Sequence, residues 1–189
     1  LASNYSISTG QTTTADITAK ALTLSGITAL NKVYNGNTSA TVDVSSAVYT
    51  GLVDGDDLTV SATGTFDNKN VGTGKTVTLS SSYSGDDTGN YSITDQTSTT
   101  ADITVKTLTA SASASNKTYD GDNTSTVTLT LTGVVDGDTV TSSNSSTFSD
   151  KNVGSGKTVT VNTVTLAGDD SDNYTIATGQ TTTANITAK

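Results

Sequence analysis

The sequence has 189 residues, a formal net charge of −9 and a pI near 4.1, so it lacks the basic surface that nucleic acid binding requires. It contains no His, Cys, Met, Trp or Pro, and its charged residues are nine Lys and 18 Asp. Without His or Cys, no Ser-His-Asp or Cys-His nucleophile can form. The paired Asp residues lie beside Gly in expected turns, not in the buried setting that acid–base catalysis needs. We therefore expect no enzyme activity.

Short runs in which Thr, Val, Ile, Leu and Tyr alternate with polar residues predict β-strands along the whole chain. Strands are expected near residues 22–30, 39–49, 57–64, 75–83, 90–95 and 99–106, with the same pattern over 107–189. Tight turns are predicted between them at Asn35-Gly36, Asp54-Gly55, Asp120-Gly121 and Asp136-Gly137. No segment has apolar residues at helical spacing, and no apolar run is long enough to cross a membrane.

An internal repeat organises the chain. The motif Asn4-Tyr5-Ser6-Ile7 returns at residues 90–93 and, with Thr for Ser, at 173–176. A second motif, Ala15-Asp16-Ile17-Thr18, returns at 101–104 and, with Asn for Asp, at 184–187. We interpret residues 1–20 as the tail of a preceding repeat, 21–106 as repeat 1 and 107–189 as repeat 2. The chain is accordingly expected to be part of a longer protein. The repeat is too long for a solenoid coil and has the length of one small β-sandwich.

The fold class predicted is all-β, with immunoglobulin-like sandwiches joined end to end. The residues before Tyr91 and Tyr174 have the spacing of a tyrosine corner, in which the hydroxyl bonds back to the upstream backbone. We expect aromatic residues of the repeated motifs to have structural roles. These residues are Tyr34, Tyr91, Tyr119, Tyr174, Phe66 and Phe148.

Five motifs follow one another in the same order in both repeats. In repeat 2 they are Lys117-Thr118-Tyr119-Asp120-Gly121, Gly133-Val134-Val135-Asp136-Gly137-Asp138, Phe148 with Asp150-Lys151-Asn152-Val153-Gly154, Leu166-Ala167-Gly168-Asp169, and Asn173-Tyr174. This series resembles the YDG-type repeats of large bacterial adhesins and filamentous-haemagglutinin-like exoproteins. Repeat 1 has Asn35 in place of the motif Asp. The resemblance implies an extracellular, multi-copy stalk at the bacterial surface, and it implies no activity.

Calcium is the one cofactor that the sequence suggests, because Asp residues cluster in the predicted turns and calcium binds six to eight oxygen ligands. The alternative is that Asp-Gly pairs only make turns. The candidate ligands are Asp54, Asp56, Asp57, Asp120, Asp122, Asp136, Asp138, Asp169, Asp170 and Asp172. Lys32 and Lys117 are candidates for an intramolecular isopeptide bond, which would suit a protein that bears load.

We expect the repeats to be structural spacers of a secreted adhesin or filament. Little slack separates Ile103-Thr104-Val105-Lys106 from Leu108, which predicts stiffly aligned neighbours. One alternative is a module that binds glycan or host protein through its loops, with Tyr49 and Tyr83 as exposed aromatic candidates. Another alternative is a self-assembling fibre subunit whose residues 1–20 add as a strand to a neighbour. The expected partners are thus neighbouring repeats, with no nucleic acid and no membrane insertion.

Overall fold

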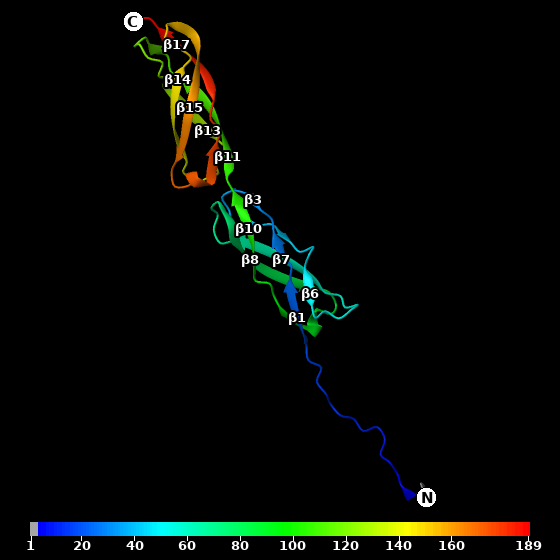
Figure 1. Cartoon of the computed structure of the whole chain (residues 1–189). Helices are drawn as coiled ribbons and strands as arrows, with labels where there is room; N and C mark the ends of the chain where they lie inside the picture. The colour runs from blue at the N-terminus through cyan, green and yellow to red at the C-terminus, as the bar shows by residue number, and fades with distance from the viewer. Residues whose placement is uncertain (1–3) are drawn as a thin grey trace.

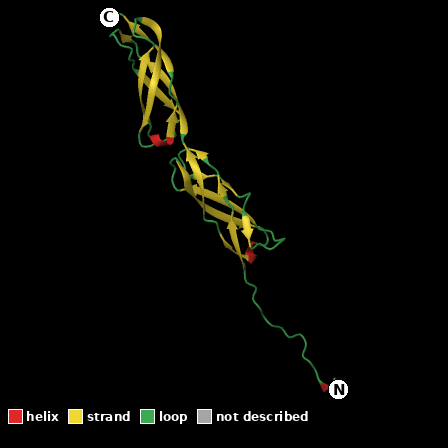
Figure 2. Cartoon of the chain, in the orientation of Figure 1, coloured by secondary structure: helices red, strands yellow, loops and turns green. Residues whose placement is uncertain are grey.

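A computed structural model describes residues 4–189 of the chain. It consists of two elongated β units placed end to end, with residues 5–19 running as an extended segment beyond the first (Figure 1). Strands dominate both units, and each contains a one-turn 3-10 helix near one end (Figure 2). Within the described range, no helix is long and apolar enough to span a membrane. The prediction of an all-β chain is confirmed.

Repeat 1 contains a three-stranded sheet in the order β6-β1-β9, a five-stranded sheet in the order β3-β10-β8-β7-β4, and a short β2-β5 pair. Strand β1 runs parallel to β9, and β3 runs parallel to β10, whereas the long β7-β8 hairpin is antiparallel. Its elements are β1 (Lys20–Ser25), β2 (Thr28–Ala29), β3 (Lys32–Val33), β4 (Ser39–Ala40), β5 (Val42–Asp43), β6 (Val48–Thr50), β7 (Thr59–Phe66), β8 (Gly72–Ser84), the 3-10 helix η2 (Thr88–Asn90), β9 (Tyr91–Thr94) and β10 (Ser98–Thr104).

Repeat 2 contains the corresponding sheets, in the orders β13-β11-β16 and β12-β17-β15-β14. Strand β11 runs parallel to β16, and β12 runs parallel to β17. Its elements are β11 (Lys106–Ala114), β12 (Lys117–Thr118), β13 (Val127–Thr132), β14 (Thr141–Phe148), β15 (Gly154–Ala167), the 3-10 helix η3 (Ser171–Asn173), β16 (Tyr174–Ile176) and β17 (Thr181–Thr187).

Alternation along the hairpin strands builds the core of each repeat. Every second side chain of β8 and β15 points inward, so Val77 and Val159 are fully buried at equivalent positions. Phe66 and Phe148, at the ends of β7 and β14, are also buried and belong to the two main core clusters. Each fully buried side chain of this size stabilises the fold by roughly 1.5–3 kcal/mol.

The strand prediction differs from the structure first at 22–30, where the expected strand divides into β1 and β2. The expected strand at 39–49 divides into β4, β5 and β6, and the expected strand at 75–83 is the central part of the 13-residue β8. The first difference lies next to Gly26, whose φ of +82° ends β1 and whose Cβ would meet the carbonyl of Ser46 at 2.3 Å. The equivalent stretch of repeat 2 has no glycine and is continuous in β11. The immunoglobulin-like sandwich remains a prediction.

The connection between the repeats is a single residue. Strand β10 ends at Thr104 and β11 begins at Lys106, so only Val105 lies between the last strand of repeat 1 and the first strand of repeat 2. The two core regions are continuous across this connection, because the cluster around Tyr34 and Phe66 also includes Leu108 and Tyr174. The end of one repeat is therefore packed directly against the beginning of the next.

Candidate functional site: the junction between the repeats

A buried carboxylate lies at the centre of the contact between the repeats. The side chain of Asp138, in the loop between β13 and β14, is only 3% exposed. Its Oδ2 accepts hydrogen bonds from the hydroxyls of Tyr34 (2.7 Å) and Tyr174 (2.6 Å), and its Oδ1 accepts one from Nζ of Lys69 (2.8 Å). Tyr34 and Lys69 belong to repeat 1, so a single side chain of repeat 2 holds two side chains of its neighbour.

Tyr34 is the buried aromatic side chain that repeat 1 contributes to this contact. It follows β3, is 1% exposed, and packs edge-on against Tyr174 with ring centroids 5.4 Å apart. Lys69 Nζ lies 5.9 Å from the centroid of the Tyr34 ring, within the range of a cation–π contact. Beside it, Gly36 approaches Val135 so closely that an added Cβ would lie 2.7 Å from the Val135 Cγ1.

A second set of polar contacts surrounds this centre. Lys69 Nζ forms an ion pair with Asp170 at 3.0 Å. Asn173, which is buried in η3, accepts a hydrogen bond from the backbone N–H of Val71 at 2.9 Å and donates one to Asn70 at 3.4 Å. We call this whole contact the junction. Its inserting end is Tyr34, Lys69, Asn70 and Val71, and its receiving end is Val135, Asp138, Asp170, Asn173 and Tyr174.

The electrostatics of the junction favour the ionised Lys–Asp pair. Burial disfavours the charge on Asp138, but hydrogen bonds from Lys69, Tyr174 and Tyr34 outweigh burial and lower its pKa. Hydrogen bonds to Asp138 and Asp170 raise the pKa of the Lys69 amine. Burial, followed by the hydrogen bond to Asp138, raises the pKa of Tyr174 to about 12. At neutral pH Asp138 is therefore ionised, Lys69 is protonated and Tyr174 is neutral. The arrangement favours a stable contact between the repeats over proton transfer among these groups.

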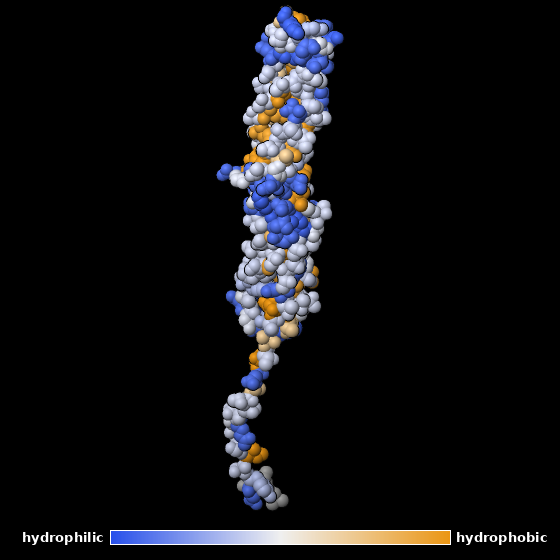
Figure 3. Space-filling model, turned by 90° about the vertical axis from the view of Figure 1, so that its left-hand side faces the viewer, coloured by the Kyte–Doolittle hydropathy of each residue, from blue (hydrophilic) through white to orange (hydrophobic). Residues whose placement is uncertain are grey.

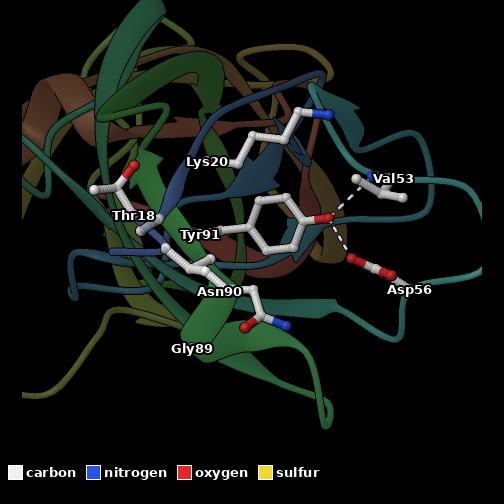
Figure 4. Close-up of a pocket in the computed structure, with 9 residues that line it drawn as sticks. Thr18, Lys20, Val53, Asp56, Gly89, Asn90 and Tyr91 are labelled. Atoms are coloured by element: carbon white, nitrogen blue, oxygen red, sulfur yellow. Dashed lines mark hydrogen bonds between the residues drawn. The ribbon is translucent and has the colours of Figure 1, made fainter. Parts of the chain in front are cut away.

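The receiving end of repeat 1 has the same residues, but within residues 4–189 no second repeat packs against it. Tyr91 donates a hydrogen bond to Asp56 and accepts one from the Val53 N–H at 3.0 Å, as Tyr174 does with Asp138 and Val135 (Figure 4). These side chains line an open pocket together with Asn90 and residues 17–20. At the equivalent place on repeat 2, Tyr34 and Lys69 bond to the carboxylate.

The inserting end of repeat 2 is similarly open. Tyr119 and Val153, the counterparts of Tyr34 and Val71, are 36% and 53% exposed. Over residues 4–189, neither the Tyr119 hydroxyl nor the Lys151 amine forms a hydrogen bond or ion pair. Figure 3 shows hydrophilic atoms (blue) at mid-length, where the two repeats meet, and again at the C-terminal end of the molecule.

The repeated motifs that form the junction lie within the two ranges that a family profile matches. The YDG domain profile matches residues 18–101 and 104–184. The chain belongs to the YDG domain family. Comparisons with curated proteins and with solved structures find no match. In this YDG pair, the Tyr of the Tyr-Asn-Gly motif is the inserting Tyr34, and its Gly is Gly36, which makes room for Val135.

The candidate calcium ligands of the YDG pair are distributed over several contacts. Asp138 and Asp170 bind Lys69, whereas Asp120 and Asp122 bind Lys117 at 2.8 and 2.7 Å. The Asp56 carboxylate accepts a hydrogen bond from Tyr91, and the backbone N–H of Asp57 donates one to the carboxylate of Asp87, which was not among the candidates. Over residues 4–189, no three acidic side chains group closely enough to hold a metal ion. The remaining candidates are exposed: Asp54, Asp136, Asp169 and Asp172. Calcium binding stays a prediction.

The predicted structural aromatics lie in two environments. Phe66 and Phe148 are core residues. The hydroxyls of Tyr91 and Tyr174 accept hydrogen bonds from the upstream backbone N–H groups of Val53 and Val135, respectively. These bonds cross 38 and 39 residues, so they tie separate loops together and differ from a corner that closes on the residues just before it.

Tyr49 and Tyr83, the aromatic candidates for a loop-based binding module, are half-buried within repeat 1. The Tyr49 hydroxyl accepts the Val60 N–H, and Tyr83 donates to Asp95. Lys32, the first isopeptide candidate, bonds to the Asn37 side chain at 3.0 Å and to two carbonyl oxygens. Lys117 is paired with exposed carboxylates. The isopeptide bond is thus also still a prediction.

Sequence reasoning missed the junction residues Lys69, Asn70, Val71 and Asn173. Each belongs to a repeated motif, Lys-Asn-Val-Gly or Asn-Tyr, that is unchanged between the repeats. The signal that could have revealed them was identity between the repeats, which for Lys69, Asn70 and Val71 falls in a predicted loop where no core packing requires it.

Proposed function

We propose that this YDG pair is a structural spacer in a secreted bacterial surface protein of the adhesin or filament type, without catalytic activity. The observation that carries the proposal is the junction: one linking residue, Val105, and a carboxylate, Asp138, that holds side chains of both repeats. A chain of such units would keep distant regions of the parent protein at a fixed separation and orientation.

The junction resists bending for a physical reason. Tilting one repeat relative to the other would remove Tyr34 and Lys69 from Asp138 and bring the Tyr34 ring, which is 1% exposed, into water. Exposing a buried side chain of this size costs roughly 1.5–3 kcal/mol, so bent arrangements are sparsely populated. Without such contacts, two domains that share only a small polar interface are expected to move relative to each other.

The extracellular and adhesin assignments are supported by the resemblance of the five ordered motifs to repeats of such proteins. The composition agrees with this setting, since acidic surfaces keep extended proteins soluble and the chain has no thiol that an oxidising environment could modify. The non-catalytic assignment is supported by the junction itself, where the groups with shifted pKa are engaged with one another.

A distance distribution between the repeats tests the proposal. Because the chain has no Cys, Ser80→Cys on β8 and Thr165→Cys on β15 place one spin label on each repeat at exposed positions. Pulsed electron paramagnetic resonance should give one narrow distance for the otherwise native protein. Lys69→Ala should broaden it, and Lys151→Ala, the same change at the open end of repeat 2, should not. A broad distribution in the native protein would refute a stiff spacer.

A further inference from the structure

The chain enters and leaves each repeat at opposite ends, and in both places it does so on a strand. It enters repeat 1 on β1, at the end that carries the extended segment, and leaves it on β10, beside the junction (Figure 1). In repeat 2 the first strand is β11 and the last is β17. The strands run broadly along the length of each repeat (Figure 2). A pull on the chain therefore acts along the axes of these first and last strands, in opposite directions.

The direction of a pull decides how the hydrogen bonds of a strand break. These bonds lie across the strand, perpendicular to it in antiparallel pairs and slanted in parallel pairs. A strand pulled along its own axis is loaded in shear, so all of its bonds are strained together. A strand peeled from one end loses its bonds one after another, and each step needs little force. Forced unfolding is governed by the rate of crossing the unfolding barrier, which is highest where many bonds must break at once.

The first strand of repeat 1 is paired on both sides. Strand β1 runs parallel to β9 over Lys20–Thr23 and antiparallel to β6 over Thr23–Ser25. Two of its side chains, Leu22 and Leu24, point into the core and are 1% and 2% exposed. Sliding β1 out along its axis would break both sets of strand contacts and bring both leucines into water.

The last strand of repeat 1 is paired on both sides as well. Strand β10 runs antiparallel to β8 from Ser98 to Ile103 and parallel to β3 at Ile103 and Thr104. The carbonyl oxygen of Thr104 also accepts the backbone N–H of Tyr34 at 2.9 Å. Because only Val105 separates β10 from β11, tension passes from one repeat to the next through two strands, with no loop between them to extend.

An asparagine side chain adds a bond to the last strand where its pairing is irregular. The register of β10 on β8 shifts at Asp102, and the backbone N–H of Asp102 donates to Oδ1 of Asn31 at 2.7 Å. The Asn31 amide in turn donates to the Asp102 carboxylate at 3.4 Å. In repeat 2 the backbone N–H of Asn185 donates to Oδ1 of Asn116, also at 2.7 Å. Both repeats therefore use the same Asn to bind the last strand to the residues that precede β3 or β12.

Repeat 2 has the same pairing of its first and last strands. Strand β11 runs parallel to β16 over Lys106–Leu108 and antiparallel to β13 over Thr109–Ala114. Strand β17 lies between β15 and β12, and the Thr187 carbonyl accepts the Tyr119 N–H at 2.9 Å. Both repeats thus meet a pull along the chain with strands that have a neighbour on each side.

We infer that the YDG pair bears tension, and that the first and last strands of each repeat resist it in shear. The inference rests on the proposed spacer function, because only a chain that is attached at both ends is stretched. Resistance to tension is nevertheless a separate property from stiffness. Stiffness depends on the junction, whereas resistance to tension depends on the pairing of β1, β10, β11 and β17 within the repeats.

Single-molecule force spectroscopy with two attachment geometries tests the inference in the full-length chain. Thr12→Cys with Lys189→Cys attaches the handles so that the pull passes through both repeats. Thr59→Cys with Asp86→Cys attaches them at the open end of the β7-β8 hairpin, where Thr59 lies opposite Ser84, so the pull peels the hairpin apart. All four positions are exposed, and the chain has no Cys of its own. We expect the end-to-end unfolding force to be severalfold higher than the peeling force, and equal forces would overturn the inference.

Asn31→Ala tests the contribution of a single bond to the loaded strand. It should shift one of the two end-to-end unfolding events to lower force and leave the peeling force unchanged, because Asn31 bonds to Asp102 in β10. Asp43→Ala removes an exposed turn bond to the Ser45 N–H and should change neither force. An equal loss in both geometries for Asn31→Ala would show that this side chain has no specific part in resisting the pull.

The two proposals fail in different measurements. A low end-to-end unfolding force together with a narrow distance between the spin labels would overturn the inference and leave the spacer proposal intact. A high end-to-end force together with a broad distance distribution would refute the stiff spacer and support strands that resist tension.

Discussion

The hydroxyl of Tyr34 donates a 2.7 Å hydrogen bond to the carboxylate of Asp138, 104 residues further along the chain and in the other repeat. The same carboxylate oxygen receives Tyr174, and the other oxygen receives Lys69. Because the Asp138 carboxylate is almost completely shielded from solvent, its hydrogen-bond donors must come from the protein. Two of the three donors come from the neighbouring repeat. Asp138 thus makes the stability of repeat 2 depend on repeat 1.

Tyr34→Phe should destabilise the protein by about 1–2 kcal/mol, since it removes one donor from a buried carboxylate and keeps the ring that packs on Tyr174. If the repeats unfold together, this corresponds to a fall in Tm of about 3–6 °C, measurable by calorimetry. Tyr119→Phe is the matched control and should leave Tm unchanged in the monomer, because its hydroxyl has no partner over residues 4–189. Equal losses for the two variants would mean that the Tyr34 hydroxyl contributes nothing specific.

Much of the fold follows from local patterns. Alternation predicted the inward-facing residues of the hairpin strands, and the four Asn-Gly and Asp-Gly turns all place their Gly at positive φ, as a tight turn requires. The parallel pairing of β1 with β9 could not be predicted, because the two strands are about 70 residues apart and neither shows a preference for a partner.

The junction was also beyond a local analysis. Asp138 and Asp56 occupy equivalent turns of the two repeats, yet only Asp138 receives a tyrosine hydroxyl and a lysine amine from the other repeat, whereas Asp56 accepts from Tyr91 of its own repeat. The difference depends on which repeat end has a neighbour, and that is a property of the stacked pair. For the same reason Tyr34 and Tyr119 share a motif while one is buried and the other is open.

The junction should lose stability in acid. The folded-state pKa of Asp138 is lowered from the ordinary value of 3.8, so its contribution is present above that pH and is lost as pH falls through the folded pKa. Lys69 has a raised pKa, so its contribution is complete below its ordinary value of 10.5 and declines only at higher pH. Stability should therefore be flat from about pH 5 to 9 and fall below about pH 4.

Comparison with Asp138→Asn isolates this contribution, because other Asp residues also have lowered pKa values and contribute to acid unfolding of either protein. Thermal melts should show a Tm difference between native and variant proteins at neutral pH that narrows as pH falls below about 4. A difference that stays constant down to pH 2 would show that the charge on Asp138 does not stabilise the folded state.

Calcium should have little effect on Tm, because four of the candidate carboxylates already bind Lys69 or Lys117. A ligand that binds only the folded state raises stability with its concentration, so differential scanning fluorimetry with added calcium or with chelator gives a direct measurement. The expected result is one melting curve for both conditions. A rise of several degrees that saturates with calcium, and is reversed by chelator, would instead establish a calcium site.

Gly36→Ala and Gly121→Ala separate the strain within a repeat from the contact between repeats. Both glycines have positive φ, +80° and +93°, so an Ala at either position costs about 1 kcal/mol of backbone strain. Only at Gly36 does the new methyl group also meet Val135, at 2.7 Å, which adds about 1–3 kcal/mol of overpacking. Gly36→Ala should therefore lower the unfolding free energy by roughly twice as much as Gly121→Ala, or more, as measured by denaturant melts.

The double variant Gly36→Ala with Val135→Ala identifies the cause. Truncating Val135 removes the atom that the new methyl group contacts, so the second change should recover part of the loss that Gly36→Ala produces. The same truncation combined with Gly121→Ala should be additive, since Gly121 lies in the other end of repeat 2 with open space around it. Additivity in both cycles would mean that Gly36 is required only for its turn, and that the close approach of the two repeats there does not depend on the missing side chain.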